Sequence, residues 1–104
     1  MEFISTLKAP QAIGPYSQGV KSGNLLFTSG QIALRPDGTF LDQGVEEQTI
    51  QVLKNLTNVI EAGGSTLDKV IKTTIFLANM DDFLTVNKIY EKHFSGHKPA
   101  RSTV

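Results

Sequence analysis

The stretch VIKTTIFLANMDDFLTVNKIYEKHF, residues 70–94, decides the fold because the spacing of its apolar residues changes halfway along it. Residues 70–78 are rich in β-branched side chains and alternate in character, which predicts a strand. Over residues 81–94 apolar side chains recur every three or four positions, which predicts an amphipathic helix. An acidic first turn and a basic last turn favour this helix, and Gly96 is expected to end it.

The same stretch predicts which side chains meet in the core. The inward residues are expected to be Ile71, Thr73, Ile75 and Leu77 on the strand, and Phe83, Val86, Ile89 with Tyr90, and Phe94 on the helix. The opposite face of the strand is apolar at its C-terminal end, where Phe76 and Ala78 lie. Because one layer of helices covers only one face of a sheet, we expect a second cover over that end.

Outward from this stretch, a second helix is predicted from Glu46 to the Gly63-Gly64 pair, with Ile50, Leu53, Leu56 with Thr57, and Ile60 turned inward. Short strands are predicted at 3–7, 17–21 and 25–32, with turns at 14–15, 22–24 and 36–38, and a further strand begins at 101–104. The order β-β-β-α-β-α-β predicts one α+β domain over residues 1–104, a sandwich with helices on one sheet face.

Composition narrows the classes of function. The chain has 104 residues, no cysteine, and ten basic residues against ten acidic ones. Thiol chemistry and disulfides are therefore excluded, and no basic field exists to attract nucleic acid. No stretch approaches the roughly 18 apolar residues of a membrane span, so we expect a cytoplasmic protein. A chain this short builds a modest core, which makes an oligomer plausible.

Several candidate sites find little support in the sequence. His93 and His97 have the spacing of a helical metal pair, but Gly96 lies between them and no third ligand is evident. Ser17, Ser29 and Ser102 lack the surroundings of a nucleophile, and no phosphate-binding loop is present. No metal and no cofactor are therefore expected.

Two residues have both an ordinary and a functional interpretation. Tyr16 follows the Gly14-Pro15 turn, so its ring either packs or lines a site. Arg101 follows Pro99-Ala100 and is either a common surface arginine or a carboxylate ligand, because its planar fork of donors can grip both oxygens of a carboxylate.

Read together, the segments AIGPYSQG, FTSGQI, EEQTIQVLKNLTNVIEAGG, the stretch 70–94 and KPARSTV resemble the reactive intermediate deaminase family, RidA, also called the YjgF or L-PSP family. The resemblance runs from about Ala9 to Val104. It implies an α+β subunit like a small bacterial chorismate mutase, in a homotrimer whose sheets form a barrel with clefts between subunits. It also implies hydrolysis of reactive 2-imino and enamine acids, such as 2-aminoacrylate, 2-iminopropanoate and 2-iminobutanoate, to 2-keto acids and ammonia.

The resemblance assigns roles to individual residues. Arg101 would hold the substrate carboxylate, with backbone at Ser102 and Thr103 completing the cradle. Tyr16 would line the cleft and Asn87 would border it. Gly30, with Ser29 beside it, would offer backbone to the imine nitrogen or to the water. This chemistry needs neither metal nor cofactor, since a protonated imine is already electrophilic.

The chain departs from the family pattern in two places. Thr103 stands where many relatives have cysteine, so thiol-dependent behaviour is not expected. Relatives continue for roughly twenty residues that finish the sheet and supply a glutamate thought to orient the water. We therefore expect a truncated C-terminal strand, and weak activity and a weak trimer if the biological chain ends at Val104. A small-carboxylate-binding regulator and a ribonuclease remain the alternative functions, and the neutral net charge argues against the second.

Overall fold

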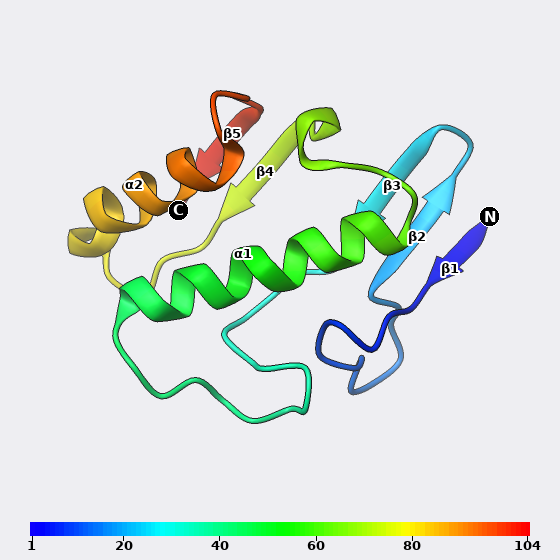
Figure 1. Ribbon diagram of the computed structural model, residues 1–104, viewed down its shortest axis with the longest axis horizontal. Helices are drawn as coiled ribbons and strands as arrows, with labels where there is room; N and C mark the ends of the chain where they lie inside the picture. Colours follow the sequence, from blue (N-terminus) through cyan, green and yellow to red (C-terminus); the bar gives the residue numbers. More distant parts are fainter.

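The change of spacing within residues 70–94 marks the junction between a strand and a helix in the computed structural model, which describes residues 1–104. The predicted order β-β-β-α-β-α-β is confirmed (Figure 1). The strands are β1 (Glu2–Ile4), β2 (Gly19–Ser22), β3 (Leu25–Thr28), β4 (Lys72–Ile75) and β5 (Ala100–Thr103). The helices are α1 (Val45–Ala62) and α2 (Phe83–Phe94). A short 3₁₀ turn, η1 (Leu67–Lys69), comes before β4, and a second, η2 (Met80–Asp82), comes directly before α2.

The strands form two separate sheets. β1, β2 and β3 pair antiparallel in that order, and the tight β2–β3 turn has Gly23 at a φ of +58°. β4 and β5 pair in parallel, with Thr73 opposite Arg101. Parallel neighbours need a long crossover, and α2 provides it. The strand that carries Arg101 is therefore held beside β4 through α2.

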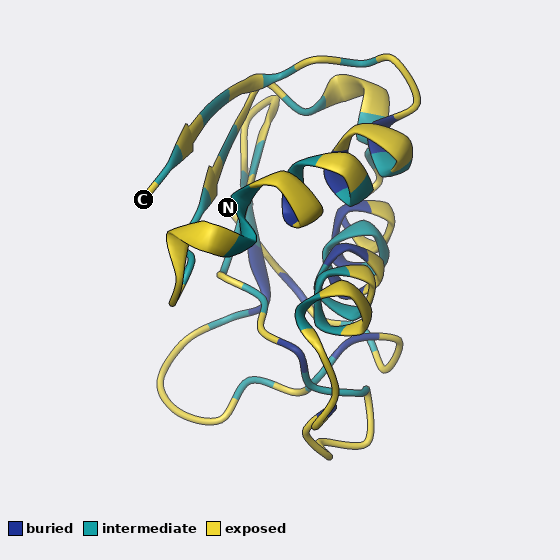
Figure 2. Cartoon of the chain, turned by 90° about the vertical axis from the view of Figure 1, so that its left-hand side faces the viewer, coloured by how far each residue is buried: buried dark blue, intermediate teal, exposed yellow.

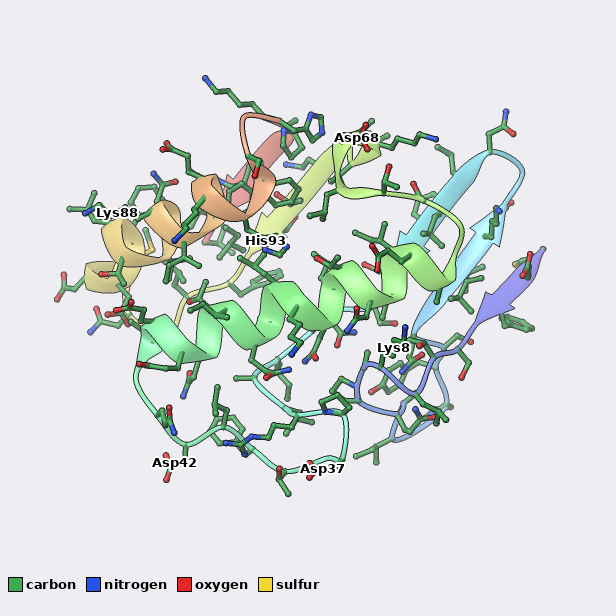
Figure 3. The ribbon with its side chains drawn as sticks, in the orientation of Figure 1. Lys8, Asp37, Asp42, Asp68, Lys88 and His93 are labelled. Atoms are coloured by element: carbon green, nitrogen blue, oxygen red, sulfur yellow. The ribbon has the colours of Figure 1, made fainter.

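Helix α1 connects the two sheets. Figure 1 shows it running across both of them, and Figure 2 shows the buried positions along its inner side. Near β2, its Val59 is fully buried and lies close to Gly19. Near β4, a core cluster contains Leu53, Tyr90 and Phe94, packed against Leu67, Val70, Ile75 and Ile89. The two helices also meet through a 2.8 Å contact between Thr57 Oγ1 and His93 Nε2, with His93 directed from α2 toward α1 (Figure 3).

Strand β4 begins later than predicted, and this changes its faces. Ile71 was expected inward but is 72% exposed, whereas Val70 packs against the core cluster. The reason is that η1 and the extended Val70 precede the strand, so regular pairing begins only at Lys72. Phe76 is 79% exposed, so the chain itself does not cover this face, and the expected second cover stays a prediction.

The other element boundaries differ by a few residues. Ile50 was expected inward but is 52% exposed, because the buried row of α1 starts one turn later at Leu53. Ser95, at a φ of 49°, caps α2 before Gly96 does. β1 ends at Ile4 because the chain then bonds to the side chain of Gln18 rather than to a strand. Neither helix is long and apolar enough to cross a membrane.

Candidate functional site

Arg101 lies on the side of β5 that faces α2. Residues along β5 alternate between exposed and half-buried, and Arg101 is half-buried beside Thr73 of β4. Its Cζ atom is 4.9 Å from the centroid of the Tyr90 ring and 5.6 Å from that of Phe83. A guanidinium stacked on ring faces gains cation–π attraction and keeps its plane fixed. Arg101 is therefore held in place without using up its hydrogen-bond donors.

The platform under Arg101 comes from one face of α2. Phe83, Asn87 and Tyr90 follow one another at steps of four and three residues, so they project from the same side of the helix. The Tyr90 hydroxyl is 2.7 Å from Thr73 Oγ1, which fixes the ring against β4. Helix and strand thus place the amide of Asn87 and the guanidinium of Arg101 next to the same aromatic surface.

A cavity of about 370 Å³ opens beside this platform, and we call it the Arg101 cavity. It is lined by Asn87, Tyr90, Glu91, Gly96, His97, Lys98, Pro99 and Arg101. Every fully buried polar side-chain atom of the protein has a hydrogen-bond partner. The guanidinium of Arg101 makes no hydrogen bond within the protein, so its nitrogens are not fully buried and its donors face solvent. A carboxylate could accept from two of them.

The pairing of β5 also determines which backbone groups are free. Ala100 N donates to Ile71 O and Val104 N donates to Ile75 O. In a parallel ladder the backbone groups of alternate residues bond to the same neighbouring strand. The N–H group of Ser102 therefore also faces β4, and the N–H groups of Arg101 and Thr103 point to the open edge of the sheet. The Ser102 hydroxyl lies on the other face, where it accepts from Lys72 Nζ at 2.6 Å.

Tyr16 lies in a separate part of the protein, on the loop between β1 and β2. Gly14 has a φ of +126°, and Tyr16 N donates to Gly14 O at 2.9 Å. The Tyr16 hydroxyl accepts from Ile13 N at 3.3 Å, while the residue remains 53% exposed. The predicted turn therefore does present the ring at the surface, in a fixed orientation.

The side chain of Gln18 holds the same loop from the interior of the protein. This side chain is only 3% exposed, and its Oε1 accepts from Thr6 N at 2.6 Å. Its Nε2 donates to Thr6 O at 3.1 Å and to Pro10 O at 2.7 Å. A buried amide that is fully bonded holds the loop more specifically than apolar packing would.

Ser29 and Gly30 follow β3 directly and lie beside the Tyr16 loop. Ser29 donates through its hydroxyl to Ser17 O at 2.5 Å and through its N–H to Gln18 O at 2.9 Å. A Cβ placed on Gly30 would have no atom within 4 Å, so the backbone at Gly30 borders open space. A cavity of about 200 Å³, the Tyr16 cavity, is lined by Pro10, Gln11, Ile13, Tyr16, Gln18, Gly30, Gln31, Ile32 and Leu34.

The predicted site residues thus form two groups. Arg101 and Asn87 line one cavity, Tyr16 and Gly30 line the other, and the two cavities share no residue. Figure 1 shows the two regions at different ends of the molecule, β5 at one and the β1–β2 loop at the other. Within one protomer, the structure therefore does not bring Tyr16 to Arg101.

The two histidines are engaged elsewhere. His93 Nε2 bonds to Thr57, and burial lowers the pKa of His93 below its usual value of 6.5. His97 Nε2 is 2.7 Å from Val70 O. No group of three or more His, Cys, Asp or Glu side chains is placed to hold a metal. The nitrogens that would have formed the metal pair instead hold structural hydrogen bonds.

Sequence reasoning missed two kinds of residue near the site. Tyr90 and Phe83 were expected in the core, and their spacing with Asn87 was the available signal that they share a face with it. The buried amides of Gln18 and Asn55 had no signal, because polar residues are normally expected at the surface.

Comparison with known proteins gives consistent matches. A model of the family described as Endoribonuclease L-PSP matches residues 6–104. The chloroplastic Reactive Intermediate Deaminase A of Arabidopsis thaliana is 52% identical over 103 residues, which cover 98% of this chain and 55% of that protein. The 2-iminobutanoate/2-iminopropanoate deaminase of Mus musculus is 49% identical over 102 residues, which cover 97% of this chain and 76% of that protein.

Solved structures of related proteins match this chain in fold as well as in sequence. YyfA of Yersinia pestis, from the conserved Rid protein family, matches with a TM-score of 0.96 and 48% identity, over 99% of this chain and 83% of that one. E. coli TdcF, solved with bound serine, matches with a TM-score of 0.95 and 39% identity, over 100% of this chain and 84% of that one.

Proposed function

The chain belongs to the family described as Endoribonuclease L-PSP, the family of the RidA reactive intermediate deaminases. On that premise we propose that it hydrolyses reactive 2-imino acids. The substrates would be 2-iminopropanoate and 2-iminobutanoate, with their enamine tautomers such as 2-aminoacrylate. The products would be the corresponding 2-keto acids and ammonium. Relatives that share about half of the sequence are named for this reaction.

The observation that carries the proposal is the stacked guanidinium of Arg101. It lies over Tyr90 at the wall of an open cavity, with donors free to meet an anion. A carboxylate bound there by two parallel hydrogen bonds is fixed in plane, and its C2 atom is fixed with it. TdcF, a relative, binds serine, which has the same carboxylate and a nitrogen on C2.

The proposed reaction is an addition followed by an elimination. Water adds to C2 of the protonated imine, and the C=N double bond becomes a single bond. One proton then passes from the added water to nitrogen, the C–N bond breaks, and the remaining hydroxyl proton leaves with ammonia as ammonium. The protein has only to hold the carboxylate, orient the water and stabilise the developing charge.

The remaining residues would act from a neighbouring copy. Because Tyr16, Gly30 and Ser29 lie away from Arg101 in one protomer, we propose that they meet it across a homotrimer interface. Exposed Phe76 and Phe27, at 79% and 60%, are consistent with faces that become covered on assembly. Gly30 backbone would meet the nitrogen or the water, and Thr103 N–H would complete the cradle, with Ser102 and Asn87 at its border.

The test is ammonia release from 2-aminoacrylate generated in situ. Arg101→Ala should abolish catalysed release while circular dichroism shows the fold retained. Arg101→Lys should also lose most activity, since a single ammonium cannot form the bidentate pair. Lys88→Ala removes the same charge from an exposed position outside the Arg101 cavity and serves as the control. Full activity in Arg101→Ala would contradict the assignment.

The name of the family model raises one further possibility, cleavage of RNA. The equal numbers of basic and acidic residues give no field that would gather phosphates. Incubation with single-stranded RNA at low salt checks this directly. Cleavage that survives Arg101→Ala would point to a second activity, and binding of keto acids without turnover of imines would favour a regulatory role.

A further inference from the structure

We propose that Asn55 is a positioning residue for imine hydrolysis, acting on the backbone at Gly30 from the interior of the protein. The inference deepens the proposed function and rests on it. Asn55 lies in the middle of α1, on the side covered by the segment that follows β3. It is completely buried, and it and Val59 are the largest fully buried side chains in the chain.

The hydrogen bonds of Asn55 fix its orientation. Nδ2 donates to Leu34 O at 2.7 Å and to Ile32 O at 3.3 Å. Both partners are carbonyls and can only accept, so the nitrogen of the amide has to face them. Oδ1 accepts from Gln51 Nε2 at 2.9 Å, one helical turn earlier. Three of the possible bonds of the side chain are therefore made, all to groups of the protein itself.

Burying an amide costs free energy of folding unless its hydrogen bonds compensate for the lost contact with water. Burial of an amide in place of an apolar side chain contributes little net stability, whereas its bonds define one position for the groups they hold. Asn55 bonds to the backbone at two alternate residues, and the side chain of Ala33 between them is buried. The loop is therefore held through its main chain at Ile32 and Leu34.

The link to the site is the short span between two anchors. Ser29 is tied to Ser17 and Gln18, and Ile32 is tied to Asn55. Gly30 and Gln31 lie between these anchors and line the Tyr16 cavity. Gly30 has no neighbour of its own within reach of a Cβ, so the two anchors set where its backbone groups point. Asn55 thus controls one end of the span that would meet the reacting atoms.

The test replaces the amide by groups of similar size. The carboxyl introduced by Asn55→Asp can donate at most one of the two bonds to the carbonyls, and none when it is ionised, so we expect kcat to fall about tenfold or more. KM should change less than about threefold, because Arg101 still binds the carboxylate of the substrate. Backbone amide exchange, followed by NMR, should quicken in residues 30–34 and stay unchanged in α2 and β5. As the pH is lowered, the introduced carboxyl gains a proton and can donate one bond, so the activity relative to the parent chain should partly recover.

Two further variants complete the design. Asn58→Asp makes the same change on the same helix at an exposed bond to Lys8 O, and it should leave kcat and the exchange of residues 30–34 unchanged. Gln51→Leu removes only the partner of Asn55 Oδ1 and should lower kcat by about two- to fivefold with KM unchanged. If Asn55→Asp does not fold, the Gln51→Leu variant tests the positioning role of Asn55 in its place. An unchanged kcat in Gln51→Leu would then overturn the proposal.

The outcomes separate this proposal from the one it rests on. An unchanged kcat in folded Asn55→Asp, a change in KM alone, or exchange that quickens evenly over the whole chain would each overturn the positioning role. If the parent chain releases no ammonia from 2-aminoacrylate, the proposed function fails. In that case, quicker exchange confined to residues 30–34 would still support Asn55 as the anchor, and even exchange would reject it.

Discussion

The guanidinium of Arg101 lies 4.9 Å from the centroid of the Tyr90 ring, with the two residues on facing elements, β5 and α2. The same ring joins the core cluster on one side and reaches Thr73 with its hydroxyl. The side chain of Tyr90 therefore both packs in the core and supports the guanidinium that would bind an anion. A change in the ring should affect stability and anion affinity to different extents, depending on which part is removed.

Tyr90→Phe removes only the hydroxyl contact with Thr73, so the free energy of unfolding should fall by about 1 kcal/mol. The affinity for a small 2-keto acid such as 2-oxobutanoate should hardly change. Tyr90→Leu removes the platform, and the Kd should rise about 2- to 30-fold, as expected for a lost cation–π contact. Calorimetric titration measures the affinity of both variants for the 2-keto acid. Phe94→Leu, a core change away from Arg101, is the control for altered packing. Equal affinities in Tyr90→Leu and the parent chain would show that the ring does not support Arg101.

Gly63, just beyond α1, leaves no room for a side chain. A Cβ there would lie 2.6 Å from Leu26 Cδ2 and 2.9 Å from Leu26 Cδ1, although its φ of −81° suits any residue. Gly63→Ala should therefore destabilise the protein by about 1–3 kcal/mol through overpacking alone. Combined with Leu26→Ala, the same change should cost much less, and a double-mutant cycle by urea unfolding measures the difference. Additive effects would mean that the clash with Leu26 is not the cause.

Gln18→Leu should destabilise the protein by about 2–4 kcal/mol, because it leaves the backbone of Thr6 and Pro10 without its buried partner. Proteolysis should then cut preferentially within residues 6–16. Gln11→Leu is a matched control, since Gln11 also donates to Thr6 O but from an exposed position. Thermal unfolding of both variants gives the comparison, and similar losses in the two would contradict a special role for the buried amide.

His93 should make stability depend on pH in the mildly acidic range. Burial lowers its pKa in the folded state below the ordinary 6.5, so the unfolded chain binds the proton more readily. This contribution to stability is present above pH 6.5 and is lost as the pH falls through the lowered folded-state pKa. His93→Gln keeps a donor for Thr57 but does not titrate, so its unfolding midpoint should vary less with pH in that window. Hydrogen bonds from threonines also lower the pKa values of the Asp37 and Asp68 carboxyls below the ordinary 3.8. Their contribution to stability is lost only when the pH falls below 3.8, so it does not interfere in the range where His93 titrates.

The order of elements could be predicted from sequence because it depends on local period. The alternation in β4 and the three- and four-residue steps in α2 are strong signals. The faces were less predictable. Whether Val70 or Ile71 turns inward depends on where pairing with β5 begins, which is a tertiary property.

The candidate site was predictable only in part. The resemblance of AIGPYSQG and PARS to a known family pointed to Tyr16 and Arg101. That Arg101 would rest on Tyr90 could not be read from the sequence, because a tyrosine in an apolar row is normally a core residue. Asn55 was hidden for the opposite reason, since an asparagine in a helix is normally expected to face water.

The open space around Gly30 has a consequence for how this position can change during evolution. Neither a positive φ nor a crowding neighbour requires glycine there, so folding alone would accept alanine. Any constraint on that residue would then come from the molecule that occupies the cavity or from the neighbouring copy that borders it. Substitutions at position 30 among descendants of this gene would record a change of ligand or of interface rather than a change in the fold.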